Sequence, residues 1–109
     1  MKARDRFFVD AVECSIRGMR HRVANLSLGG LFAETDRPPR EGEIVVMDLM
    51  LPSQRACLVL GQVAWINNRW KPRVTALPPG FGAAVTWVSP NDREHVAALL
   101  KTSAPVLGS

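Results

Sequence analysis

The stretch Arg22-Val-Ala-Asn-Leu-Ser-Leu-Gly-Gly-Leu-Phe32 decides how the rest of the chain is interpreted. Side chains alternate between two faces in an extended chain, so Asn25 and Ser27 point to one side and the leucines beside them to the other. The two glycines that follow favour a reversal of the chain. The stretch therefore predicts two antiparallel strands joined by a tight turn, with polar groups on one face.

Turn-forming clusters divide the rest of the chain into β-rich runs at regular intervals. Apolar residues at positions 45, 47, 49 and 51 alternate as in a half-buried strand, and those at 44, 46 and 50 suggest burial of both faces in places. Residues 67–79 suggest a long hairpin with a short strand at 74–77. The pattern predicts a meander or small barrel, whose six strands are expected at residues 8–16, 21–26, 30–34, 43–51, 57–66 and 81–88.

A helix is expected after the last of these strands. Ser89 is a good N-cap, Pro90 suits the first helical position and Asp92 places an acid in the first turn. Apolar residues at 96, 99 and 100 then form one stripe. We expect this helix to close one opening of the barrel, and residues 102–109 to form a flexible tail.

Length and composition exclude several classes of protein. A chain of 109 residues fits one compact domain. No apolar run approaches the ~20 residues that cross a bilayer, and the first residues lack the apolar core of a secretion signal. We expect a cytoplasmic protein that does not bind membranes, with Cys14 and Cys57 reduced and buried. The formal charge of +4, carried mainly by arginine, suits an anionic partner.

The sequence contains no recognisable catalytic motif. His21 and His95 do not belong to a metal-binding pattern with cysteines or acids, and no glycine-rich phosphate loop or nucleophile elbow occurs. We therefore expect a protein that is not an enzyme and has no metal or cofactor. Trp65 and Trp87 lie in apolar strand patterns and are expected in the core, whereas Trp70 is expected to be exposed.

The run Asn25-Leu-Ser27-Leu-Gly-Gly30 resembles the Asp/Asn-x-Ser-x-x-Gly signature of PilZ domains, the bacterial receptors for the second messenger cyclic di-GMP. The resemblance covers most of the chain. Its other parts are the run from Arg6 to Asp10, Gly61-x-Val-x-Trp65, the Pro79-Gly-x-Gly82 turn and the Ser-Pro-x-Asp start of the helix.

The resemblance implies a fold of the all-β class, a six-stranded antiparallel β-barrel of PilZ type with one C-terminal helix, here at residues 8–101. It also implies a ligand-binding segment at residues 1–7, which carries an Arg-x-x-x-Arg motif in the family. Arg6 matches the second arginine of that motif, but Lys2 occupies the first position, with Arg4 as an alternative cation. The ligand-binding residues implied for cyclic di-GMP are thus Lys2, Arg4, Arg6, Asn25, Ser27 and Gly30.

Three functions remain open at this point. The first is a cyclic di-GMP receptor that signals to a bacterial protein partner by ordering its N-terminal segment. The second is a degenerate PilZ adaptor that binds protein and no nucleotide, a hypothesis motivated by Lys2, because lysine lacks the planar pair of donors that arginine offers. The third, ranked well below the others, is a basic barrel for single-stranded nucleic acid that uses Arg20, Arg22, Arg69, Lys71 and Arg73 with Trp70 as a stacking platform.

Overall fold

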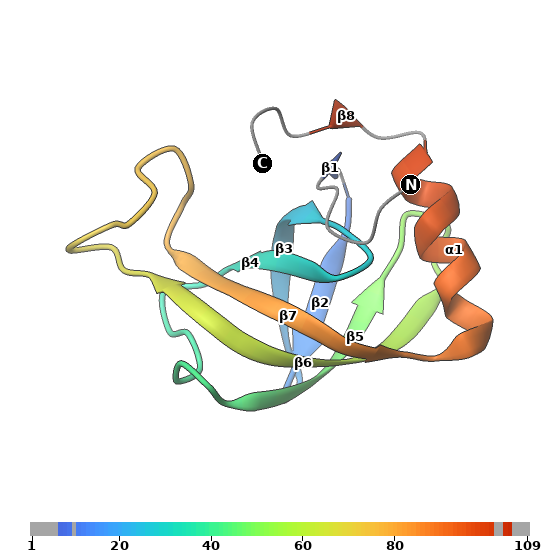
Figure 1. Ribbon diagram of the computed structural model, residues 1–109, viewed down its shortest axis with the longest axis horizontal. Coiled ribbons are helices and arrows are strands. Elements are labelled where there is room, and N and C mark those ends of the chain that lie inside the picture. The colour runs from blue at the N-terminus through green and yellow to red at the C-terminus, as the bar shows by residue number, and fades with distance from the viewer. Residues whose placement is uncertain (1–6, 10, 102–103, 106–109) are drawn as a thin grey trace.

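The computed structural model describes residues 7–9, 11–101 and 104–105 (Figure 1). The described residues form eight strands and one helix: β1 (Phe7–Phe8), β2 (Glu13–Ile16), β3 (Met19–Leu26), β4 (Gly30–Glu34), β5 (Ile44–Met50), β6 (Ala56–Asn67), β7 (Gly80–Val88), α1 (Pro90–Lys101) and β8 (Ala104–Pro105). Of the tail expected at 102–109, only β8 is described, and the other tail residues lie outside the described part.

Six of the strands close into a barrel. Their order is β2-β5-β6-β7-β4-β3, every pairing is antiparallel, and a pairing between β2 and β3 closes the ring. The short strands β1 and β8 continue the sheet from β3. The predicted fold class, a six-stranded antiparallel barrel with one C-terminal helix, is confirmed.

The prediction of one continuous strand at 8–16 is wrong, because β1 and β2 are separate. Ala11 lies between them with a φ of 56°, a left-handed conformation that interrupts an extended chain. Val9 and Val12 are three residues apart and would face opposite sides of a regular strand. The interruption lets both reach the core, where they are 3% and 1% exposed.

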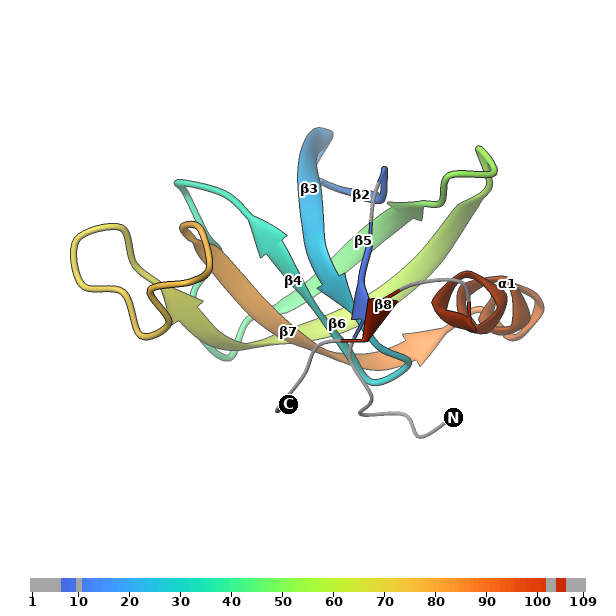
Figure 2. The ribbon, with the colours of Figure 1, turned by 90° about the horizontal axis from the view of Figure 1, so that it is seen from above.

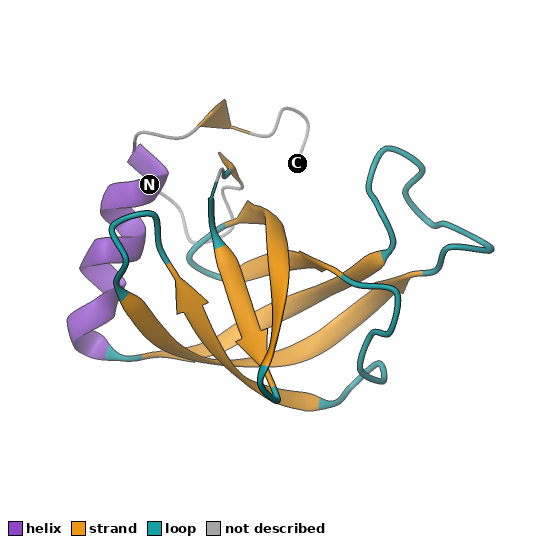
Figure 3. Ribbon diagram, turned by 180° about the vertical axis from the view of Figure 1, so that it is seen from behind, coloured by secondary structure: helices purple, strands orange, loops and turns teal. Residues whose placement is uncertain are grey.

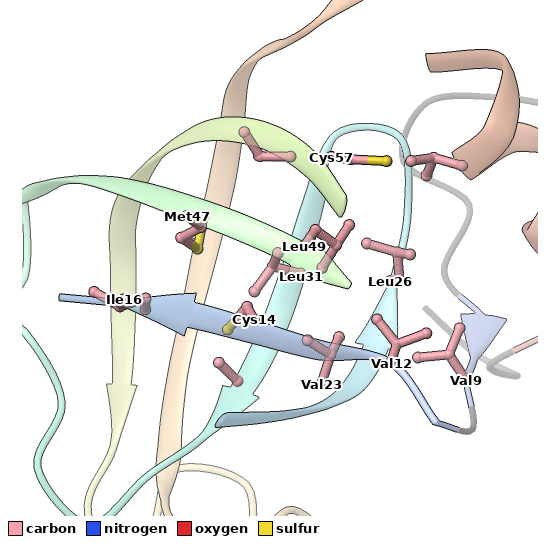
Figure 4. Close-up of a cluster of buried hydrophobic side chains, with 14 of the residues drawn as sticks. Val9, Val12, Cys14, Ile16, Val23, Leu26, Leu31, Met47, Leu49 and Cys57 are labelled. Carbon is pink, nitrogen blue, oxygen red and sulfur yellow. The ribbon is translucent and has the colours of Figure 1, made fainter. Parts of the chain in front are cut away.

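The barrel interior is filled by alternating side chains, many of which converge in the close-up of Figure 4. On β5, Val45, Met47 and Leu49 are buried as the alternation predicts. The suggestion that the opposite face is also buried is wrong for this strand, since Ile44 is 60% and Val46 58% exposed. The outer face of β5 thus presents two apolar side chains to solvent, next to the exposed Asp48.

Both cysteines lie inside the barrel, as predicted. Cys14 on β2 and Cys57 on β6 are each paired with Leu49 of β5, so the three side chains form one row across neighbouring strands. Burial raises the pKa of the Cys14 thiol to about 12 and also raises that of Cys57. The backbones of Cys14 and Cys57 are separated by two strand spacings of about 4.8 Å each. This distance exceeds what a disulfide spans, so the two thiols do not bridge.

Helix α1 starts where the sequence predicts it. The amides of Asp92 and Arg93 donate to the carbonyl of Ser89, and the Asp92 carboxylate pairs with Arg55 of the β5–β6 hairpin at 2.9 Å. Val96 and Leu100 are buried against the barrel. Within the described part of the chain, no helix is long and apolar enough to cross a membrane.

The helix and the loop between β6 and β7 lie at opposite ends of the molecule in all three ribbon views (Figures 1, 2 and 3). The predicted strand at 74–77 is wrong, because these residues belong to that loop. Trp70 in the same loop is exposed, as expected. The expectation of a buried Trp87 is also wrong: it lies on the outer face of β7 and is 43% exposed, while Trp65 is half-buried.

Candidate functional site

The turn between β3 and β4 is held by Ser27. Its amide donates to the carbonyl of Gly30 at 2.8 Å, and its hydroxyl donates to the same carbonyl at 3.2 Å. The hydroxyl also accepts a hydrogen bond from the amide of Gly29 at 3.1 Å. The described glycines with positive φ are Gly18 and Gly42, so the reversal does not depend on a left-handed glycine.

These hydrogen bonds leave the Ser27 hydroxyl partly available to a ligand. A hydroxyl has one donor hydrogen and two acceptor lone pairs. Its donor hydrogen goes to the Gly30 carbonyl, which also receives the shorter bond from the Ser27 amide. If the hydroxyl turned toward a ligand oxygen, that carbonyl would keep a hydrogen-bond partner, and the turn would keep its main-chain closure.

Asn25 lies at an irregular point of β3. The register between β3 and β4 shifts between Val23 and Asn25, and Asn25 is then opposite Phe32. Asn25 and Ser27 are 5% and 3% exposed, whereas Leu26 between them belongs to the hydrophobic core. Both polar side chains are thus largely buried, at and just beyond the end of β3.

The backbone of the turn is joined to β7. The amide of Val85 donates to the carbonyl of Gly29 at 2.9 Å, and Gly30 is paired with Ala84. Gly30 is buried in this position. The signature residues Asn25, Ser27 and Gly30 are thus brought together on strands that are fixed on both sides.

The described N-terminal chain begins beside this turn. In β1, Phe7 is paired with Leu26 and Phe8 with Asn25. The cations expected to bind the ligand, Lys2, Arg4 and Arg6, lie outside the described residues. The strand that follows them directly in sequence is nevertheless the one that pairs with the signature.

Sequence reasoning missed the contact between this turn and the helix. Ser27 and Leu28 line a small apolar crevice of about 10 Å³ together with Arg93 and Val96 of α1. Arg93 itself is exposed. No local signal marks this arginine, because its position depends on how the helix docks on the barrel, some 60 residues away in sequence.

The histidines do not contribute to this site. His21 is half-buried on β3 opposite Cys14, and His95 is exposed on α1. Among the residues that the structure describes, no group of three or more His, Cys, Asp or Glu is placed to hold a metal ion. The site offers an amide, a hydroxyl, main-chain groups and nearby arginine, a set that suits binding of a polar ligand.

A closed six-stranded barrel with a C-terminal helix and an Asn-x-Ser-x-x-Gly turn defines a class of small β-barrel receptor and adaptor domains. The family model described as PilZ domain matches residues 7–102, and the chain belongs to this family. Domains of the family bind cyclic di-GMP or act as PilZ-type adaptors, and are generally not enzymes. Comparisons with curated proteins and with solved structures gave no significant match.

Proposed function

We propose that this protein is a cyclic di-GMP receptor that signals to a protein partner in the bacterial cytoplasm. The observation that carries the proposal is the pairing of β1 with β3 at Leu26 and Asn25. This pairing places the start of the described chain next to the signature turn. The preceding residues, which include Lys2, Arg4 and Arg6, are therefore within reach of a ligand bound at Asn25, Ser27 and Gly30.

The chemistry of the ligand matches these residue types. Cyclic di-GMP presents two phosphates and two guanines, and an arginine fork donates two parallel hydrogen bonds to phosphate or to a guanine edge. In the proposed complex Arg6 supplies that fork, and Asn25 donates and accepts at a guanine. Ser27 turns its hydroxyl to a phosphate oxygen, and Gly30 has no side chain to obstruct the ligand. Arg93 adds a further cation from α1.

Binding also supplies the signal in this proposal. The ligand orders the residues that precede β1 over the outer face beside β3, and this changes the surface that a partner protein meets. No bond is made or broken. The receptor needs no cofactor, because the ligand itself shifts the population of the N-terminal segment.

Isothermal titration of cyclic di-GMP into the full chain tests the proposal, with cyclic di-AMP as the control for guanine recognition. We expect saturable heat with cyclic di-GMP and none with cyclic di-AMP. Absence of heat well above micromolar concentration would contradict the receptor function. It would favour the adaptor function, which the lysine at position 2 already supports.

A further inference from the structure

The loop between β6 and β7, residues 68–79, presents an exposed tryptophan at the end of the barrel opposite α1 (Figures 1 and 2). Trp70 is 86% exposed, the largest fraction among the large hydrophobic side chains of the described residues. Exposure of a ring of this size to water is unfavourable. The fold gains nothing from this exposure, which points to a role of the loop in binding.

A single buried side chain fixes the conformation of this loop. Asn67 is 1% exposed, and its Nδ2 lies 3.0, 3.1 and 3.0 Å from the carbonyl oxygens of Val74, Leu77 and Pro78. Its Oδ1 accepts from the amides of Arg73 and Val74 at 2.9 and 3.0 Å. An amide group has two hydrogens, so one hydrogen is shared between two of the three carbonyl oxygens. The side chain can therefore neither donate nor accept a further hydrogen bond.

The loop also covers part of the outer face of the barrel. Trp65 packs on Phe32 with ring centroids 5.4 Å apart, and Arg73 lies 5.8 Å from the centroid of the Trp65 ring. Gly82 makes room for this packing, because a Cβ there would lie 2.0 Å from Nε1 of Trp65. The loop thus has an inner side that packs on the barrel, and Trp70 belongs to its outer side.

Beside Trp70 lies a groove of about 180 Å³ between the loop and the β4–β5 connection. Its walls include Pro38, Ile66, Pro79 and Trp70. Polar groups come from Thr35 and Asn68, and the ion pair between Arg69 and Asp36 also lines it. The volume is well above the ~10–15 Å³ that the smallest water-holding cavity needs. The groove therefore has room for an apolar side chain of a partner, inserted next to the exposed ring.

The surroundings of the groove are positively charged. Three segments meet at this end, residues 17–19, 35–43 and 68–79, joined by ion pairs from Arg17 to Glu43 and from Arg69 to Asp36. They contain six Lys or Arg against three Asp or Glu, a net charge of +3 of the +4 carried by the whole chain. Arg37 and Lys71 are exposed around the groove.

We propose that this loop end is a preformed docking surface for an acidic segment of a partner protein. An apolar side chain of the segment fills the groove beside Trp70, and its carboxylates face Lys71 and the neighbouring arginines. Tryptophan and arginine are the residues most often found at binding hot spots. Because Asn67 fixes the loop in advance, binding does not have to order it.

The charge pattern favours a protein segment over nucleic acid. Asp36, Glu41 and Glu43 interrupt the cations, whereas a nucleic-acid strand needs a continuous basic track for its phosphates. Single-strand binding also uses successive aromatic rings, and Trp70 is a lone exposed ring in this loop. The docking surface lies at the end opposite α1, so the proposal does not depend on whether the protein binds nucleotide.

The test is a selection of phage-displayed 12-residue peptides on the immobilised full chain, followed by titration of the recovered peptides. We expect enrichment of peptides with Asp or Glu beside an apolar residue. Trp70→Ala and Lys71→Glu should each weaken their binding at least about tenfold. The matched control is Trp87→Ala, which removes another exposed tryptophan three residues before α1 and should change affinity less than about twofold.

Several results would overturn the proposal. They are recovery of no peptide, recovery of peptides without acids, and peptides that bind Trp70→Ala as tightly as the wild type. A fifteen-nucleotide dT strand or phosphatidylglycerol vesicles that bind more tightly than the peptides, with the same dependence on Trp70, would assign the surface to another class of partner. Equal melting temperatures of wild type and variants show that lost binding does not reflect unfolding.

Discussion

The two ends of the barrel are each organised by one buried polar side chain, and the difference between them is instructive. Asn67 at the loop end takes part in five hydrogen bonds to main-chain groups six to eleven residues away. Ser27 at the helix end makes two, both within three residues, and its acceptor Gly30 is also bonded by the Ser27 amide. The loop therefore depends on the Asn67 side chain, whereas the turn would keep its main-chain closure without the Ser27 hydroxyl, as the proposed ligand contact requires.

The largest effect that this comparison predicts is on stability. Asn67→Ala removes the buried side chain that binds five main-chain groups of the loop and should lower the free energy of unfolding by about 3 kcal/mol. Asn68→Ala is the matched control, because the exposed Asn68 accepts only the local bond from the Trp70 amide. We expect it to cost less than about 1 kcal/mol. Urea unfolding measures both, and equal costs would contradict the assignment of Asn67.

Ser27→Ala should show the opposite pattern. We expect it to weaken cyclic di-GMP binding by about ten- to a hundredfold, since the ligand loses a hydrogen bond to a charged oxygen. Its cost in stability should be about 1 kcal/mol, because the main-chain bond that closes the turn remains. Titration and urea unfolding give the two values. Ser15→Ala, on β2 away from the turn, should leave the affinity for cyclic di-GMP unchanged. Asn67→Ala should also leave this affinity unchanged, provided that it is measured below the melting temperature of the variant.

Between the two ends, the buried thiol of Cys14 makes the stability of the barrel depend on pH. The folded-state pKa of Cys14 is about 12, above the ordinary value of 9.0, so the folded protein holds this proton more tightly than the unfolded chain does. The thiol's contribution is fully present below pH 9 and is lost as pH rises toward 12, at about 1.4 kcal/mol per pH unit.

Urea unfolding at pH 8, 9, 10 and 11 in the presence of a reductant measures this loss. The chain contains no tyrosine, which removes one competing alkaline titration. We expect Cys14→Ala to show a shallower decline than the wild type. Identical slopes for the two proteins would show that burial of this thiol does not drive the alkaline loss.

The smallest predicted effect concerns position 2, which lies outside the described residues. Lys2→Arg restores the planar pair of donors of the family motif, and a bidentate contact to guanine is worth ~1–3 kcal/mol. We expect the substitution to tighten cyclic di-GMP binding by roughly fivefold or more. Titration of wild type and variant side by side measures it. Equal affinities would mean that position 2 does not contact the ligand.

What the sequence predicted correctly depends on local patterns. The alternation around Leu49 identified the core face of β5, and Ser89-Pro90 identified the start of the helix. These signals need no knowledge of distant neighbours.

The features that were missed arise from contacts far apart in the sequence or from an unusual backbone conformation. Ala11 has a positive φ that no local signal marks in an alanine. Arg93 reaches the turn only because α1 docks on the barrel. The role of Asn67 could not be predicted, because its partners lie within an irregular loop. Trp87 resembles a core residue in sequence but lies on the outer face.

The most direct test of the account is to map the nucleotide on the protein by ¹H–¹⁵N spectra recorded during addition of cyclic di-GMP. If the nucleotide binds at the signature turn, we expect saturable shifts of the backbone amides at residues 25–30 and in β1, with the amides of residues 68–79 and the indole of Trp70 unchanged. Shifts centred on residues 68–79, or a spectrum unaffected by the nucleotide, would contradict it.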